Sequence, residues 1–236
     1  MKKIVVITST RAEYGLLKPV IKKIQKSKFL DLQLIVTGAH LSGLYGNTID
    51  TINSDGFSIK ESIDLDLGDN TEDGVANSFA KAVSGFSLYL HKSSCDCVLL
   101  LGDRYEILAF AVSALIHNVP IAHLHGGEVT IGAIDESIRH AITKLSKLHF
   151  AATSEYASRI VQMGEDPKRV FNVGGLGADV INQTRIFSKD ELSASLGVNI
   201  LDYRNRIIVT FHPETCDQAS GLEQLKALLR VLSGMN

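Results

Sequence analysis

Short apolar runs alternate with helix-period segments along most of the chain. The runs contain Val, Ile and Leu without regular polar alternation, which is typical of parallel strands buried on both faces. The predicted strands are Lys3–Thr8, Gln33–Thr37, Cys97–Leu101, Val119–Leu124, His149–Ala152 and Val170–Val173. The predicted helices are Glu13–Lys26, Glu72–Lys92, Tyr105–Ile116, Glu136–Leu145 and Glu155–Met163. This alternation predicts an α/β fold in which helices wrap a parallel sheet.

The pattern changes in the last quarter of the chain. Residues 174–205 combine a glycine-rich start, short helical pieces and a polar stretch, which predicts a linker. Arg206–Phe211 then predicts a strand, and Gly221–Leu232 predicts an amphipathic helix. One strand with one helix cannot bury both faces of the strand. We therefore expect residues 1–174 to form a complete domain, and 175–236 to hold a linker and the incomplete start of a second.

Composition narrows the class of partner. The chain has 236 residues and a formal net charge of −2, and its 24 Lys and Arg residues are scattered, so nucleic acid and anionic membranes are not expected. No apolar stretch approaches the length of a membrane span or a signal sequence, which predicts a cytoplasmic protein. Cys95, Cys97 and Cys216 lack zinc spacing and are expected to be buried thiols. A small-molecule partner fits these features best.

A cation and three hydroxyl groups lie at the end of the first predicted strand and just after it, in TSTRAEYG. Arg11 offers a forked cation, and the helix expected from Glu13 offers free backbone N–H groups, which together suit a phosphate or sugar hydroxyls. The alternative is an ordinary helix cap with Arg11 in solvent. The stretch lacks the Gly-x-Gly-x-x-Gly pattern of dinucleotide-binding folds, so NAD is disfavoured and no cofactor is expected.

An acidic and a basic residue follow a later strand, in LLLGDRYE. In open α/β sheets, ligands bind beyond the carboxyl ends of the strands, where Asp103 and Arg104 are expected. Asp103 is either a proton carrier whose pKa Arg104 depresses or a cap of the next helix. Capping alone does not explain Arg104, which favours a functional interpretation.

The stretch HLHGGEVTIGAIDESIRHA concentrates ionisable side chains after one strand. They are His123, His125, Glu128, Asp135, Glu136, Arg139 and His140. His123 and His125 are expected on the same face of a strand, and the glycine pair allows a ligand to approach the backbone. Helix-terminal carboxylates and a packing histidine would explain single members, whereas the whole cluster indicates acid–base chemistry. A metal site is not expected, because His123 and His125 lack a third ligand with suitable spacing.

Four separated motifs carry a resemblance to a known family. They are TSTRAEYGLLKP, GDRYEILAFAVSA, HGGEVTIGAIDESIRHAITKLSKLHF and VTFHPET. In this order, from residue 3 to residue 215, the chain resembles the hydrolysing UDP-N-acetylglucosamine 2-epimerases that supply N-acetylmannosamine for sialic acid synthesis. The resemblance implies a glycosyltransferase-B type architecture, with two Rossmann-like domains and the nucleotide sugar in the cleft between them.

The resemblance also implies a reaction and residues that serve it. These enzymes convert UDP-N-acetylglucosamine and water to N-acetylmannosamine and UDP without NAD. A base removes the C2 proton, UDP leaves, and 2-acetamidoglucal takes up water, so an acid and a base must reach the sugar. By position, Asp103 and Asp135 match carboxylates around the sugar, and Arg11 and Arg104 match nucleotide-sugar contacts. His212 matches a sugar-site histidine from the second domain.

Two departures leave alternatives open. Several relatives have an acidic residue where this chain has His125, so either His125 or Glu128 takes that acid–base duty, or the substrate is a GDP-linked or 2,4-diacetamido sugar. The base and the acid stay unassigned among Asp103, His125, Glu128 and Asp135.

The second departure is length, since the resemblance implies a full second domain, of which we expect only the start here. A truncated chain that binds nucleotide sugars without turnover is therefore one alternative, and a non-hydrolysing 2-epimerase is another. Family members usually associate, so a homo-oligomer is expected.

Overall fold

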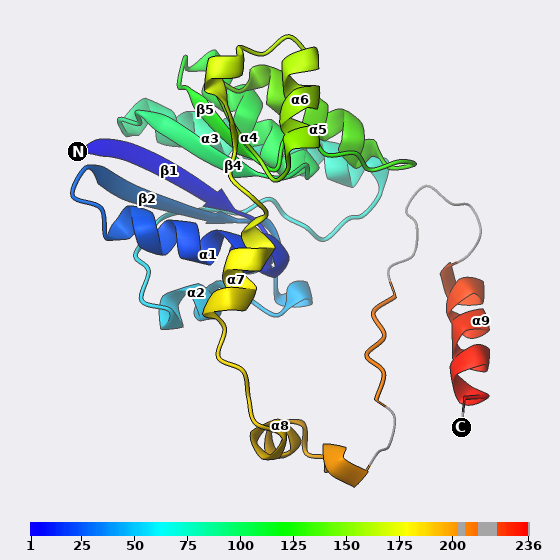
Figure 1. The fold of residues 1–236 in the computed structure, drawn as a ribbon. Helices are drawn as coiled ribbons and strands as arrows, with labels where there is room; N and C mark the ends of the chain where they lie inside the picture. Colours follow the sequence, from blue (N-terminus) through cyan, green and yellow to red (C-terminus); the bar gives the residue numbers. More distant parts are fainter. Residues whose placement is uncertain (203–205, 212–220, 236) are drawn as a thin grey trace. The chain divides into compact units, whose positions relative to one another are not determined.

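The computed structural model describes residues 1–202, 206–211 and 221–235, and its main body is a parallel sheet wrapped by helices (Figure 1). The sheet has seven strands in the order β3-β2-β1-β4-β5-β6-β7, and each neighbouring pair runs parallel. The strands are β1 (Lys2–Thr8), β2 (Leu30–Thr37), β3 (Ile59–Ile63), β4 (Cys97–Leu101), β5 (Ile121–Leu124), β6 (Leu148–Ala151) and β7 (Val170–Asn172). The α/β fold expected from the sequence is therefore confirmed.

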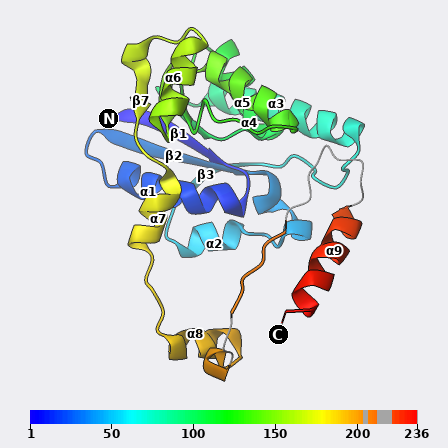
Figure 2. The ribbon, with the colours of Figure 1, turned by 45° about the vertical axis from the view of Figure 1, so that its right-hand side comes forward.

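Helices follow the strands in the predicted alternation, although the sequence predicts none at Ile49–Ser54. They are α1 (Arg11–Gln25), α2 (Ile49–Ser54), α3 (Glu72–Lys92), α4 (Tyr105–Ile116), α5 (Ile134–Leu145), α6 (Ser154–Gln162), α7 (Leu176–Gln183), α8 (Lys189–Leu196) and α9 (Gly221–Ser233). Figure 2 shows α1 and α2 on one side of the sheet and α3, α4 and α5 on the other. Both faces of the central strands are thus covered.

Successive strand residues enter two different hydrophobic clusters. In β1, Val5 and Ile7 pack with α3 and α4, whereas Val6 packs with α1 and α2, and all three are fully buried. The same alternation recurs in β2 and β4. Strands buried on both faces explain why these runs are apolar throughout. Leu176, at the start of α7, joins the second cluster.

Two predicted features differ from the structure. The apolar pattern does not predict β3, in which three polar residues separate Ile59 from Ile63, because an edge strand with exposed positions lacks the continuous apolar run. The strand expected at Arg206–Phe211 is wrong, since these residues have no regular structure and Ile208 is 97% exposed. No neighbouring strand within the described residues pairs with them, and an isolated strand leaves its backbone groups unpaired.

Contacts divide the chain into two compact units. The first contains Met1–Thr130 and Ile134–Asn182, and the second contains Ile131–Ala133 and Gln183–Asn236. The domain boundary expected after residue 174 stays a prediction. Cys95 and Cys97 are half-buried rather than buried, and Cys216 lies outside the described residues. In the described parts of the chain, no helix has both the length and the apolar character needed to cross a bilayer.

Candidate functional site

Three of the sequence motifs meet at the carboxyl edge of the sheet. The chain order reverses between β1 and β4, because β2 and β3 lie on one side of this pair and β5 to β7 on the other. Such a switch point is where open α/β sheets bind ligands. The segments after β1, β4 and β5 carry Arg11, Asp103, Arg104 and His125.

A cavity of about 540 Å³ lies at this edge and contains two of the predicted substrate-binding residues. Its lining residues are Thr10, Arg11, Ala12, Ala39, Tyr45, Thr48, Leu67, Asp69, Asn70, Val75, Arg104 and Tyr105. Arg11 is the first residue of α1, and Tyr105 is the first residue of α4. Because helix N-termini carry partial positive charge and free N–H groups, two helices and two arginines favour an anion here.

At the start of α1, both features expected for TSTRAEYG are present: a helix cap and an arginine that can face a ligand. Thr10 is the helix cap, since its hydroxyl accepts from the Glu13 N–H at 3.5 Å and the Glu13 carboxylate accepts from the Thr10 N–H at 3.3 Å. Arg11 is exposed and lines the cavity. The cap therefore fixes the helix end that presents Arg11.

Three buried polar side chains under the cavity were not predicted as site residues. His40 lies 2.9 Å from Thr8 Oγ1 and 2.7 Å from the cavity-lining Thr48, and burial lowers its pKa to about 4. Burial raises the pKa of Glu13 to about 7; the Ser9 N–H opposes this shift and the Glu106 carboxylate adds to it. Glu106 is fully buried. For Glu106, the signal in the sequence was a single acid within the apolar helix sequence YEILAFAV.

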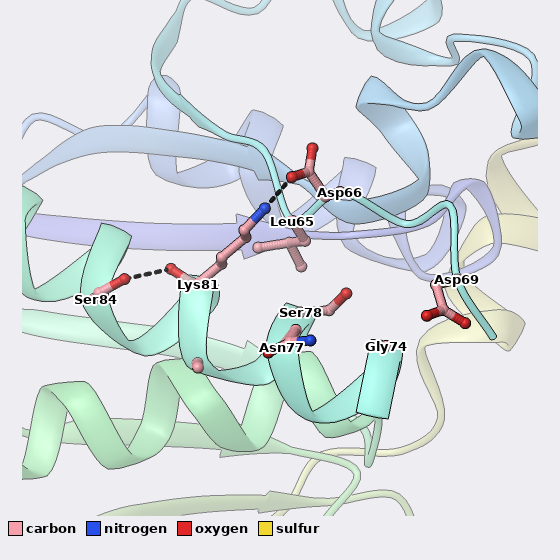
Figure 3. Close-up of a pocket in the computed structure, with 9 residues that line it drawn as sticks. Leu65, Asp66, Asp69, Gly74, Asn77, Ser78, Lys81 and Ser84 are labelled. Carbon is pink, nitrogen blue, oxygen red and sulfur yellow. Dashed lines mark hydrogen bonds and ion pairs between the residues drawn. The ribbon is translucent and has the colours of Figure 1, made fainter. Parts of the chain in front are cut away.

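A second hollow, of about 560 Å³, borders the cavity on its α3 side (Figure 3). Asp69 lines both hollows. The cation of the second hollow, Lys81, pairs with Asp66, as the dashed line in Figure 3 marks. Two carboxylates, Asp66 and Asp69, line this hollow with one cation, so the cavity with Arg11 and Arg104 is the better anion site.

An acidic cluster forms on the α5 side of the same edge. Asp103 accepts a hydrogen bond from Nη2 of Arg139 in α5. Burial raises the pKa of the Asp103 carboxyl above its ordinary value; Arg139 opposes the rise, and the negative charges of Asp135 and Glu128 add to it. The charges of the two other predicted catalytic carboxylates therefore reach Asp103, which links the three in one acidic cluster.

Glu128, one of these three carboxylates, forms a hydrogen-bonded pair with His125. His125 Nδ1 lies 2.7 Å from Glu128 Oε1, and His125 Nε2 lies 3.5 Å from the Leu176 N–H, from which it accepts. The imidazole therefore carries its proton on Nδ1 when neutral. Although burial opposes the shift, the hydrogen bond and charge of His125 lower the pKa of Glu128 on balance.

The expectation that His123 and His125 share a strand face is wrong. β5 ends at Leu124, and His125 has φ +62°, so strand alternation does not reach it. His123 is fully buried; its Nε2 lies 2.8 Å from the Gly102 carbonyl and its Nδ1 lies 3.2 Å from Thr143 Oγ1. Burial lowers the pKa of His123 to about 4, so this ring is neutral and both of its nitrogens are engaged.

The remaining candidates have simpler settings. Asp135 lies in the first turn of α5. Glu136 accepts from the Thr130 N–H at 3.1 Å, and its other oxygen lies 3.9 Å from His140, so these two residues have local structural roles. Arg139 is 7% exposed, and in the described part of the chain its Nε and Nη1 have no hydrogen-bond partner. His212 lies outside the described residues.

The fold and the site define a class of protein: a Rossmann-like α/β protein with a cavity lined by two arginines and an acidic cluster at its switch point. A family model described as UDP-N-acetylglucosamine 2-epimerase matches residues 22–235. The chain therefore belongs to the UDP-N-acetylglucosamine 2-epimerase family.

Curated relatives agree with this assignment. The chain is 39% identical to the polysialic acid biosynthesis protein P7 of Escherichia coli, over 99% of this chain and 59% of that protein. It is also 39% identical to the GDP/UDP-N,N'-diacetylbacillosamine 2-epimerase (hydrolyzing) of Campylobacter jejuni, over 98% of this chain and 59% of that protein. This chain thus spans about three fifths of the length of these relatives.

A solved structure supports the fold. The crystal structure of UDP-GlcNAc 2-epimerase from Neisseria meningitidis, bound to UDP-GlcNAc, superimposes with a TM-score of 0.67 and 23% identity. The match covers 77% of this chain and 49% of that one. The expected fold class, a Rossmann-like α/β domain of glycosyltransferase-B type, is therefore confirmed.

Proposed function

We propose that this chain carries the sugar-side acid–base groups and a diphosphate-binding cavity of a hydrolysing nucleotide-sugar 2-epimerase. The proposal rests on the different surroundings of two neighbouring residues, Asp103 and Arg104. Asp103 lies in the acidic cluster and accepts a hydrogen bond from Arg139, whereas Arg104 lines the cavity with Arg11. Consecutive residues thus connect a group suited to proton transfer with a group suited to holding phosphate.

The reaction begins with removal of the proton from C2 of the amino sugar. Asp103 and the His125–Glu128 pair are the proton-transfer groups. His125 takes the C2 proton on Nε2, which gives up its long hydrogen bond from the Leu176 N–H, while Glu128 orients the ring through Nδ1. The C1–O bond then breaks and its electrons leave with the nucleoside diphosphate. Asp103 relays a proton from the water that adds at C1 to the opposite face of C2.

Arg11 and Arg104 hold the departing diphosphate, because their charges and the two helix N-termini stabilise the negative charge that develops there. Water then adds to the glycal with the opposite configuration at C2, which yields free N-acetylmannosamine from UDP-N-acetylglucosamine. Asp135 completes the set of carboxylates around the sugar.

A 2,4-diacetamido sugar linked to GDP or UDP is the second candidate substrate. The observation that favours it is the 39% identity with the C. jejuni relative named for diacetylbacillosamine. The chemistry at C2 is the same for both sugars, so the acid–base assignment above holds for either.

Proton NMR in D2O tests this proposal. The purified chain is incubated with UDP-N-acetylglucosamine and separately with its 2,4-diacetamido analogue. Free sugar of inverted C2 configuration, with deuterium at C2 and an equal amount of UDP, is the expected product. An intact epimerised nucleotide sugar would instead indicate a non-hydrolysing epimerase, and saturable binding without turnover would indicate a binding chain.

A further inference from the structure

Glu106 is a fully buried acid directly behind Arg104. Its Oε1 accepts a hydrogen bond from Arg104 Nε and another from Ser9 Oγ at 2.9 Å. Its Oε2 is buried and has no hydrogen-bond partner within the described residues. A buried carboxylate is costly unless it is paired. The ion pair with Arg104 therefore explains how the Glu106 carboxylate can be buried.

Arg104 uses only one side of its guanidinium group to bind Glu106. In the described part of the chain, Nε is the atom of Arg104 that donates a hydrogen bond, whereas the Nη1–Nη2 edge makes none. The side chain is 46% exposed and lines the cavity. The guanidinium group is planar, so holding Nε restricts the direction of the outer edge.

The second ligand of Glu106 connects it to the loop after β1. Ser9 donates its hydroxyl to Glu106 and its backbone N–H to Glu13, and both acids are buried. Glu13 is in turn part of the cap that starts α1 at Arg11. Arg104 is therefore bonded to a buried network that also caps the helix beginning at Arg11.

We propose that Glu106 is a positioning residue, which holds Nε of Arg104 so that the outer guanidinium edge meets the diphosphate of a nucleotide sugar in the cavity. This inference rests on the proposed function, because a diphosphate is the ligand it assigns to the cavity. An unheld arginine loses side-chain entropy on binding, and prior fixation removes much of that loss.

Charge repulsion alone predicts the opposite change in anion affinity, so an experiment can distinguish the two explanations. The charge of Glu106 lies close to the bound anion and repels it, so neutralising Glu106 should strengthen anion binding if charge alone matters. If Glu106 positions Arg104, removing its hydrogen-bond acceptor weakens binding instead. The sign of the change therefore separates the two roles.

The test is a double-mutant cycle measured by calorimetric titration of pyrophosphate and of UDP at one fixed salt concentration. Glu106→Leu removes the acceptor, Glu106→Gln keeps one, and each is made with Arg104 intact and with Arg104→Ala. We expect Glu106→Leu to weaken binding about fivefold or more with Arg104 present and less than about twofold without it. Glu106→Gln should restore most of the loss, and the exposed control Glu155→Gln should change nothing.

Each other outcome overturns a specific statement. Unchanged or tighter binding by Glu106→Leu overturns the positioning role, and an equal loss in both Arg104 backgrounds assigns Glu106 a purely structural role. If the unaltered chain binds neither probe, the diphosphate site fails, and the positioning role fails with it.

If Glu106→Leu does not fold, the Arg104 Nε–H resonance decides instead. It should shift in Glu106→Gln, where the charged acceptor is lost, and an unchanged resonance overturns the inference.

Discussion

The two sides of the sheet's carboxyl edge differ in charge and in the chemistry that they favour. Next to α1 and α4, a cavity of about 540 Å³ has two arginines and a single lining carboxylate, Asp69, among its described residues. Next to α5, Asp103 lies under the influence of Glu128 and Asp135, with Arg139 as its counter-ion. In the function proposed above, one sheet edge separates anion binding from proton transfer over one peptide bond, between Asp103 and Arg104.

The largest expected effect comes from removing the proton carrier on the acidic side. Asp103→Asn should lower the rate of sugar release by about 100- to 10,000-fold, because general acid–base groups contribute on that scale. Pyrophosphate affinity should stay within about threefold of the original value. NMR turnover and calorimetry measure both quantities, and the exposed Asp190→Asn serves as the control. An equal loss of affinity and rate would contradict the separation of the two sides.

The buried network under the cavity predicts a pH-dependent stability. The pKa of Glu13 is about 7 in the folded chain against 4.5 when unperturbed, so the folded chain binds this proton more tightly. The stabilisation is complete below pH 4.5 and is lost as the pH rises toward 7, by up to about 3 kcal/mol. Glu13→Gln should remove this slope.

Chemical denaturation of the original chain and of Glu13→Gln between pH 4.5 and 7 measures the difference. The comparison between the two proteins is needed because His123, with its pKa lowered to about 4, acts in the opposite direction and is common to both. Parallel stability curves would contradict the raised pKa of Glu13.

A smaller effect is expected on the cationic side. Arg11→Ala and Arg104→Ala should each weaken pyrophosphate binding about tenfold, since hydrogen bonds to charged groups contribute roughly 1.5–3 kcal/mol. Arg169→Ala, a half-exposed arginine on a surface ion pair, is the matched control. Titration calorimetry gives the affinities. Loss of affinity in the control alone would place the anion site elsewhere.

The smallest effect concerns Glu128. His125→Gln removes a hydrogen bond and a charge that lower the pKa of Glu128, so that pKa should rise. Carboxyl 13C resonances followed through a pH titration report the change. An unmoved Glu128 titration would mean that the His125–Glu128 pair is not the proton-transfer unit proposed here.

The sequence was most informative where side-chain chemistry is local. Apolar runs located the central strands because both of their faces are buried, and the residues after those strands located Arg11, Asp103, Arg104 and His125. The edge strand β3 was missed because its exposed positions carry polar residues. The predicted strand at Arg206–Phe211 failed because strand formation depends on a neighbour, which an apolar run does not report.

Contacts between distant residues were beyond the reach of sequence patterns. Arg139 meets Asp103 across 36 residues, and Glu106 meets Ser9 across 97. The left-handed backbone of His125 separates its environment from that of His123 although only Leu124 lies between them. These features decide which ionisable groups are buried and paired, and therefore which pKa values are shifted.

The central claim is that the diphosphate and the sugar are recognised on opposite sides of the Asp103–Arg104 bond. NMR titration of the labelled chain tests it directly, with UDP and N-acetylmannosamine added separately. UDP should shift the Nε–H resonances of Arg11 and Arg104, and N-acetylmannosamine should shift the ring resonances of His125. If UDP shifts His125 and leaves both arginines unchanged, the assignment of the two sides is wrong.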